Sequence, residues 1–286
     1  MATRGPRVPV ARNASTFHLR TSLLWSRRVA LISFRGVRKA FGPKVVYESL
    51  DLDIERGESI TIIGGSGQGK SVMLKLLIRL LVADAGSIVF DEQEVTRLKD
   101  RELGALRRRI GMLFQGAALF DSISVGENVA YGLREHYPKM PTAERRGRVA
   151  EALTMVGLPG IEGMRPSDLS GGMKKRVGLA RTIALRPEVL LYDEPTTGLD
   201  PINTTRINRL ILHLKEQLQV TSIVVTHDMT SAFFVSDRIA MIHHGYVVFT
   251  GTPDEVRRAR DARVRDFIEG NAPKGEDALA LLREGG

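Results

Sequence analysis

The chain has 286 residues, is 43% hydrophobic and 26% charged, and contains no cysteine. That length allows one large domain or two modest ones with a buried core, and the lack of cysteine excludes a disulfide framework or a cysteine metal site. The formal charge is +9, but residues 1–30 hold six arginines and no acidic residue, so the rest of the chain carries only +3 (9 − 6). No apolar run approaches the roughly 20 residues of a membrane-spanning helix, so in any membrane process another chain must do the spanning.

Residues 1–30 are a basic N-terminal extension. They contain prolines and show no sustained apolar period, so we expect them to be disordered or to precede the true start of the protein. Two alternatives stay open: an organelle transit peptide, which is rich in Arg and Ser and poor in acidic residues, and a basic strip that touches anionic lipid.

From Leu31 onward, short apolar runs alternate with helical stretches, which predicts an α/β domain over residues 31–255 with a mixed or parallel core sheet. The runs expected to be strands are Val45–Val46, Ile60–Ile63, Ile88–Phe90, Val189–Tyr192, Ile223–Val225, Ile239–Ile242 and Val247–Phe249. The stretches expected to be helices are Val72–Val82, 143–157, 173–185 and 204–218. Early and late strands joined by short turns, such as His243–Gly245, suggest an added antiparallel β layer. Residues 118–180 lack clear strands and are expected to form a helical subdomain, and residues 256–286 a charged C-terminal extension.

The eight residues after Ile60–Ile63 have the spacing of a phosphate-binding loop. They are Gly64, Gly65, Ser66, Gly67, Gln68, Gly69, Lys70 and Ser71. Glycine lets the backbone approach closely, so that N–H groups and the start of the next helix face phosphate oxygens. In such loops the lysine bridges the β- and γ-phosphates and the hydroxyl ligates Mg²⁺. We therefore expect a nucleotide with its Mg²⁺ here, rather than a flexible Gly/Ser turn.

Two further apolar runs end in reactive side chains. Val189–Tyr192 precedes Asp193 and Glu194, and Ile223–Val225 leads to His227. Ligands bind beyond the carboxyl ends of the strands in an open parallel sheet, so all three groups face one site if the strands are neighbours. Asp193 then completes the Mg²⁺ shell, Glu194 orients or deprotonates the attacking water, and His227 contacts the γ-phosphate and aligns Glu194. Taken singly, an acidic pair can simply mark a strand that leaves the core, and a lone histidine is more often structural.

A second helix start suited to an anion lies at Ser170. The sequence Leu169–Met173 opens a strongly helical segment, in which Ser170 suits an N-cap and Gly171 and Gly172 leave backbone N–H groups open. One chain has one phosphate loop, so this helix end needs the nucleotide of a partner. We expect an antiparallel homodimer in which each ATP lies between the loop of one chain and Ser170–Gly172 of the other; an ordinary capped helix is the alternative.

Together these motifs resemble the ATP-binding cassette (ABC) ATPase family of P-loop NTPases over about residues 31–255. The residues that carry the resemblance are Gly64–Ser71, Gln115, Leu169–Met173, Val189–Glu194, Gly198–Asp200 and His227. The resemblance implies that Gln115 contacts Mg²⁺ and links to the helical subdomain, and that Asp200 lies on the loop that crosses to the partner's ATP. Phe41 takes the position that stacks on adenine, where many members have Tyr; stacking needs only a π face.

Within that family, Met112–His136, Met173 and the stretch from Val264 resemble the ATPase subunits of Mla (maintenance of lipid asymmetry) transporters. This resemblance implies an ATPase homodimer at the cytoplasmic face of the bacterial inner membrane, bound peripherally to two copies of a permease. It also implies a periplasmic MCE-domain lipid-binding protein and phospholipid as cargo. The surface around residues 117–125 is expected to receive a coupling helix of the permease, although plain interior packing also fits it.

Three other functions compete with lipid transport. One is transport of another hydrophobic compound, such as a sterol or an organic solvent. A second is a cytosolic ABC-type ATPase acting on ribosomes or DNA, but ribosome-acting members carry two cassettes and DNA-repair members insert a long coiled coil between Gln115 and Ser170. Only about 55 residues lie there, so no nucleic acid partner is expected. A non-hydrolysing binding module is disfavoured by the intact Glu194 and His227.

Overall fold

The computed structural model describes residues 30–271. The expected disordered extension therefore lies outside the described residues except for Ala30, as does the end of the C-terminal extension, residues 272–286. Among the described residues, no helix combines the length and apolar character that crossing a membrane requires.

The core is a six-stranded sheet in the order β10-β9-β3-β8-β7-β6. Its strands are β3 (Ser59–Ile63), β6 (Ile110–Leu113), β7 (Val189–Asp193), β8 (Thr221–Val225), β9 (Arg238–His243) and β10 (Tyr246–Gly251). All neighbours are parallel except β10, which runs antiparallel to β9. The strands that precede the three groups of site residues are adjacent, as predicted, with β8 between β3 and β7.

Alternate residues of these strands pack into different apolar clusters, as the period of two in a strand requires. On β7, Val189 and Leu191 face one cluster, while Leu190 and Tyr192 face another. Both faces of the sheet are therefore covered, which explains why these strands read as continuous apolar runs rather than as alternating ones.

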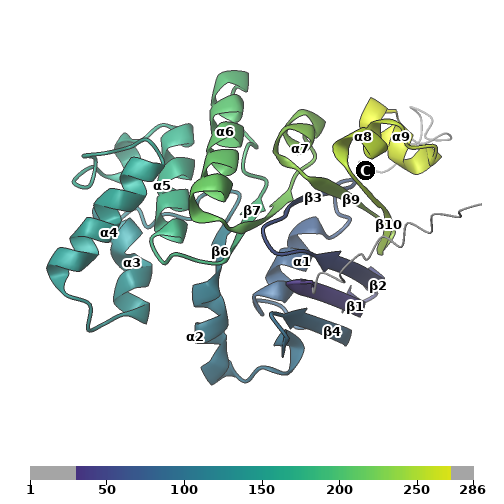
Figure 1. Ribbon diagram of the computed structural model, residues 1–286, viewed down its shortest axis with the longest axis horizontal. Helices are drawn as coiled ribbons and strands as arrows, with labels where there is room; N and C mark the ends of the chain where they lie inside the picture. The colour runs from purple at the N-terminus through teal and green to yellow at the C-terminus, as the bar shows by residue number, and fades with distance from the viewer. Residues whose placement is uncertain (1–29, 272–286) are drawn as a thin grey trace, which may run out of the picture.

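One face packs on α1 (Lys70–Leu77) and on a second, antiparallel sheet in the order β2-β1-β4-β5. Its strands are β1 (Ile32–Phe41), β2 (Lys44–Ile54), β4 (Ala85–Phe90) and β5 (Gln93–Glu94), followed by the 3-10 turn η1 (Val95–Arg97). Figure 1 shows β1, β2 and β4 grouped beside α1. The expected antiparallel layer is confirmed.

The helical subdomain contributes α3 (Val125–His136), α4 (Thr142–Met155), the 3-10 turn η2 (Pro166–Asp168) and α5 (Gly171–Ile183). Figure 1 shows α3, α4 and α5 gathered on the side away from the antiparallel sheet. Residues 114–188 are all described and contain no strand, which agrees with the expectation for residues 118–180. The predicted helices 143–157 and 173–185 match α4 and α5 to within two residues.

Helix α1 ends at Leu77, so the predicted extension to Val82 is wrong. The backbone of Arg79 adopts a φ of 56°, and the side chain of Arg107 donates to the carbonyls of Ile78 and Arg79, each at 3.0 Å. An arginine from a distant helix thus satisfies the carbonyl groups that a helix leaves unpaired at its end. No local signal marks such a partner in the sequence.

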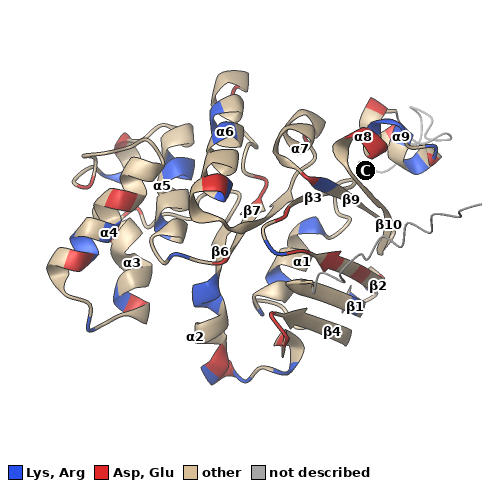
Figure 2. Ribbon diagram, in the orientation of Figure 1, with Lys and Arg blue, Asp and Glu red and all other residues tan. Residues whose placement is uncertain are grey.

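Helix α2 (Asp100–Arg109) links the antiparallel sheet to β6. Acidic residues occupy its first turn and Arg107, Arg108 and Arg109 its last, which complements the helix dipole; Figure 2 shows red and blue at its opposite ends. Arg109 pairs with Glu188, at 2.5 Å, and with Asp91. The pair with Glu188, directly before β7, ties the start of β6 to its neighbour.

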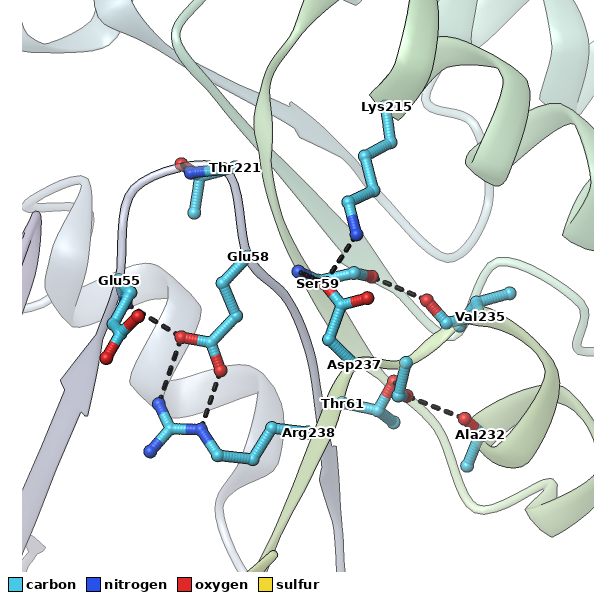
Figure 3. A network of polar contacts seen from close by, with 12 residues as sticks. Glu55, Glu58, Ser59, Thr61, Lys215, Thr221, Ala232, Val235, Asp237 and Arg238 are labelled. Carbon is cyan, nitrogen blue, oxygen red and sulfur yellow. Dashed lines mark hydrogen bonds and ion pairs between the residues drawn. The ribbon is translucent and has the colours of Figure 1, made fainter. Parts of the chain in front are cut away.

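Helices α6 (Pro201–Leu218) and α7 (Met229–Val235) lie side by side beyond the sheet. A polar network anchors their last turns at the amino ends of β3 and β9 (Figure 3). Lys215 forms an ion pair with Asp237, and Ser59 donates from its backbone N–H to Asp237 at 2.8 Å and from its hydroxyl to the carbonyl of Val235. This network lies at the end of the sheet opposite the phosphate loop.

The chain continues into α8 (Pro253–Arg257) and α9 (Ala262–Glu269). Val256 and Val264 are buried against Ile239 and Met241 of β9. The described part of the C-terminal extension thus packs on the domain, and the boundary placed after residue 255 stays a prediction.

Candidate functional site

A cavity of about 740 Å³ lies at the carboxyl ends of β3, β7 and β8. It is lined by Phe41, Lys44, Val46, Gly64, Gly65, Ser66, Gly67, Gly69, Lys70, Ser71, Val72, Gln115, Glu194, His227 and Phe267. The structure therefore brings most of the predicted site residues of one chain to one hollow. Lys44, Val46, Val72 and Phe267 line it as well, and no sequence pattern singled them out.

The loop between β3 and α1 needs glycine at two points where other parts of the chain crowd it. A Cβ at Gly64 would lie 2.4 Å from the carbonyl oxygen of Ile242, and one at Gly69 would lie 2.3 Å from Val46. Gly69 precedes α1 with a φ of 90°, and within the described residues no side chain caps that helix. The first N–H groups of α1 are therefore available to an anion at the helix start.

Lys70 is buried and folds back on the loop. Its Nζ donates to the carbonyls of Gly64 and Gly65 at 2.8 and 3.0 Å. Burial lowers the pKa of this amine, and the carboxylates of Glu194 and Asp193 oppose that shift. A phosphate that displaced these two carbonyls would give the ammonium group a charged partner in a poorly hydrated place, which strengthens the attraction.

Ser71 and Asp193 meet across the loop and the end of β7, with the Ser71 hydroxyl 2.5 Å from a carboxylate oxygen. Burial raises the pKa of Asp193, although the Ser71 hydrogen bond and nearby lysines oppose it. Among the described residues no cluster of three His, Cys, Asp or Glu side chains could hold a metal. An oxygen-only pair of one hydroxyl and one carboxylate nevertheless fits Mg²⁺, which is usually held by one or two carboxylates together with substrate phosphates and water.

Glu194 and His227 form a contact pair at the mouth of the cavity. The Nδ1 of His227 lies 2.9 Å from one carboxylate oxygen of Glu194, and Thr197 donates its hydroxyl to the other at 3.0 Å. Glu194 has a φ of 50°, and backbone strain of this kind persists where the surroundings fix it. The His227 side chain is 65% exposed and that of Glu194 only 12%. The surrounding residues therefore confine the Glu194 carboxylate, whereas the His227 ring is accessible to a ligand in the cavity.

Phe41 is placed where a flat ring can stack. It lies on the cavity wall, is 46% exposed, and has the amine of Lys39 5.1 Å from its ring centroid. An exposed aromatic face beside a cation gives a base both a stacking surface and a local positive charge.

The two glutamines of the predicted site have different surroundings. Gln115 lines the cavity just after β6, at the junction with the helical subdomain. The side-chain oxygen of Gln68 instead accepts the backbone N–H of His244 at 2.8 Å, in the turn between β9 and β10. The Gln68 side chain therefore holds the tip of the loop against this turn.

The second helix start lies apart from the loop of its own chain. Ser170 caps α5, because its hydroxyl accepts the N–H of Met173, and Gly171 is exposed. Asp200 caps α6 by accepting the N–H groups of Ile202 and Asn203. None of Ser170, Gly171, Gly172 and Asp200 lines the described cavity, so their predicted contact with nucleotide requires a second chain and stays a prediction.

Two residues that support the site have no motif. The hydroxyl of Tyr47 donates to the carbonyl of Gly69 at 2.5 Å, and buried Lys175 donates to the carbonyls of Pro195 and Thr197 at 2.8 and 2.7 Å. Lys175 thereby holds the turn after Glu194. A buried lysine is a weak signal in sequence, because helices expose most lysines.

We expect Lys175→Met to destabilise the protein by about 2 kcal/mol or more, because it leaves buried carbonyls unpaired. Burial lowers the pKa of Lys175, which shows that the buried ammonium group carries a desolvation cost. Its removal relieves that cost and offsets part of the destabilisation. Thermal unfolding measures the change. Lys174→Met is the matched control on the same helix, and an equal fall in Tm for both variants would contradict the assigned contacts.

The comparisons with known proteins agree with this geometry. Residues 47–197, more than half of the chain, match the ABC transporter family model. The chain is 41% identical over 85% of its length to the intermembrane phospholipid transport ATP-binding protein MlaF of Haemophilus influenzae, of which 91% is covered. It is 40% identical over 84% of its length to the probable ribonucleotide transport ATP-binding protein mkl of Mycobacterium leprae, of which 69% is covered.

A solved structure agrees as well: a dimeric ATP-binding cassette, MJ0796, in a post-hydrolysis state bound to ADP and phosphate. It superposes with a TM-score of 0.71 and 34% identity over 78% of this chain and 98% of that one. The predicted fold and the resemblance to Mla-type ATPase subunits are confirmed. The chain therefore belongs to the ABC transporter family, as one of its ATP-binding cassettes.

Proposed function

We propose that this chain is the ATP-hydrolysing subunit of a transporter that moves phospholipids between bacterial membranes. The observation that carries the proposal is the convergence of Lys70, the Ser71–Asp193 pair and the Glu194–His227 pair on one cavity. The identity of 41% to a protein named for intermembrane phospholipid transport supports the cargo.

In the proposed mechanism, the triphosphate displaces Lys70 from the carbonyls of Gly64 and Gly65 and accepts the N–H groups of the loop and of α1. The oxygens of Ser71 and Asp193 would hold Mg²⁺, which would supply charge stabilisation to the phosphate oxygens. Glu194, fixed by Thr197 and His227, orients or deprotonates the water that attacks the γ-phosphate. His227 keeps that carboxylate aligned.

We further propose that two copies of the chain close around two ATP molecules. In this arrangement the N-terminus of α5, with Ser170, Gly171 and Gly172, and the loop at Asp200 face the phosphate loop of the partner. The exposure of Ser170 and Gly171 supports this role, as does the dimeric, ADP-bound state of the related cassette. ATP binding then closes the pair and hydrolysis reopens it.

The partners that fit this function are two copies of an integral membrane permease and a periplasmic MCE-domain protein. The chain would bind peripherally at the cytoplasmic face of the inner membrane, through the surface near residues 117–125. Phe120 and Tyr131 are exposed there with ring centroids 4.8 Å apart, a surface suited to a helix of the permease. A permease for another hydrophobic compound remains the second candidate. The relative named for probable ribonucleotide transport is almost as similar, so identity at this level does not by itself fix the cargo.

Purification tests this assignment directly. The tagged chain, expressed with untagged candidate permease and MCE proteins, should be recovered from membranes in one complex with both partners. That complex should transfer phospholipid between vesicles only with hydrolysable ATP. Transfer of a sterol but not phospholipid would favour the second candidate, and recovery as a lone cytosolic protein would contradict the transport function.

We expect Asp193→Asn to stabilise the nucleotide-free protein while abolishing hydrolysis. A carboxyl group with a raised folded pKa contributes stability that is present below its ordinary value near 3.8 and is lost as the pH rises through the folded pKa. At neutral pH the buried, ionised Asp193 therefore disfavours folding, and a neutral amide removes that penalty. Loss of a metal ligand worth several kcal/mol should lower kcat by about 100-fold or more.

Thermal unfolding at pH 7 and pH 4 and ATPase rates check both parts. The difference in Tm between Asp193→Asn and the unaltered protein should shrink at the lower pH, where protonation removes part of the charge. A variant that hydrolyses ATP at the normal rate would contradict the proposed role of Asp193.

A further inference from the structure

Helices α6 and α7 are joined by a buried polar contact in their first halves. The side-chain amide of Asn208 on α6 donates to the hydroxyl of Ser231 on α7 at 2.8 Å. Asn208 is 4% exposed and Ser231 1%. This contact lies toward the site, whereas the network of Figure 3 ties the last turns of the same helices at the opposite end of the sheet.

The contact continues toward the catalytic carboxylate. Ser231 donates its single hydroxyl hydrogen to the carboxylate of Asp228, and the backbone N–H of Asp228 donates to the hydroxyl of Thr226 at 3.0 Å. The Thr226 hydroxyl lies 3.5 Å from a carboxylate oxygen of Glu194. Asn208 is thus linked to the two residues that flank His227.

The stability of the fold does not explain this asparagine. Its side-chain oxygen is buried and has no hydrogen-bond partner among residues 30–271, and such a group costs about 1–3 kcal/mol. Exchanging the oxygen and nitrogen of the Asn208 amide does not remove this cost. Ser231 gives its only hydroxyl hydrogen to Asp228, so it can only accept a hydrogen bond from Asn208, and the NH₂ group must face it. Neighbouring Ile207 and Ile211 are apolar, and a cavity of about 370 Å³ beside Asn208 leaves room for a larger side chain.

We propose that Asn208 is a positioning residue that couples the start of α6 to His227. Asp200 caps α6, so a movement of Asp200 at the dimer seam moves the helix that carries Asn208. Through Ser231 and Asp228, that movement sets the position of His227 relative to Glu194. The inference rests on the proposed hydrolysis and adds to it a link between the seam and the catalytic pair.

Asn208→Leu tests the link, because it removes the hydrogen-bond donor and fills space beside it. We expect a Tm equal to or above that of the unaltered protein, an unchanged KM for ATP, and a kcat lower by about tenfold, as misplaced catalytic groups cause. A purely structural residue would change Tm and leave kcat alone. An unaltered kcat in Asn208→Leu would overturn the proposal.

Ser231→Ala breaks the same link from the other helix and is smaller, so it cannot overpack the core. Its kcat should fall as much as that of Asn208→Leu, and the double variant should fall no further, because both changes remove one pathway. Independent, multiplying effects on kcat would overturn the link.

Ser236→Ala is the matched control. Its hydroxyl donates to the carbonyl of Ala232 at 2.6 Å at the far end of α7, so the variant should lower Tm without changing kcat. An equal loss of kcat in this control would mean that any loosening of α7 slows hydrolysis, and the proposal would fail. If the unaltered protein does not hydrolyse ATP at all, the proposed function fails instead.

Discussion

Replacing Glu194 with Gln should abolish ATP turnover, leave ATP binding intact and trap a dimer of the chain. The two side chains have the same shape, so the amide can keep its contacts with Thr197 and His227. The amide cannot accept a proton from water, however, and the loss of a general base lowers a rate by about 10²–10⁴-fold. Because the loop and Lys70 are unchanged, ATP still binds and the closed state accumulates.

Size-exclusion chromatography with Mg-ATP measures the trapped dimer, and phosphate release measures turnover. Glu216→Gln, an exposed change on α6 far from the cavity, is the control and should behave as the unaltered protein. Normal hydrolysis in Glu194→Gln would show that another group activates the water, and a monomer that binds ATP without pairing would contradict the two-chain site.

The strands that carry the site could be predicted from the sequence because each is buried on both faces. Strands β3, β7 and β8 contain apolar runs that only Thr61 interrupts, and each run leads into site residues, at Gly64, Asp193 and Thr226–His227. Hydrophobic periodicity was not needed to tell these strands from helices, because the short length of each run and the residues that flank it already distinguish them.

Strands β1 and β6 were harder to predict. β1 carries charged residues and shifts its register against β2 between Phe34 and Val37, so its alternating pattern is interrupted. β6 has only four residues and follows directly from the polar helix α2. β1 therefore lacks a regular apolar pattern and β6 is too short to show one, so neither is recognised without the neighbouring strands that pair with it.

The motifs identified residues that are predicted to touch a ligand but missed the residues that hold them in place. Lys175 and Tyr47 act on backbone carbonyls, and carbonyls have no sequence signature. Thr197 and Thr226 reach Glu194 only because the chain turns after β7 and β8. Such support depends on tertiary contacts, whereas a phosphate loop is local and can therefore be identified from spacing alone.

The second large effect is expected for Gly171→Asp. This variant should leave the folding of a single chain intact but prevent two chains from closing around ATP. Gly171 is the first residue of α5, and a Cβ there would meet only Leu199, at 4.0 Å. An aspartate at a helix start is favourable by about 0.3–1 kcal/mol, so the variant should fold at least as well as the unaltered protein. In a closed dimer, however, its carboxylate would face the partner's triphosphate.

Repulsion between these like charges should prevent closure, so ATP hydrolysis should fall by about 100-fold or more while a single chain binds ATP normally. Gly163→Asp is the matched control, because Gly163 is exposed in the same subdomain and a Cβ there meets no atom within 4 Å. Calorimetric ATP binding and light scattering with Mg-ATP separate the two steps. Since Gly171 lies outside the cavity of its own chain, only a site shared between two chains makes it essential, and full activity of Gly171→Asp would exclude that site.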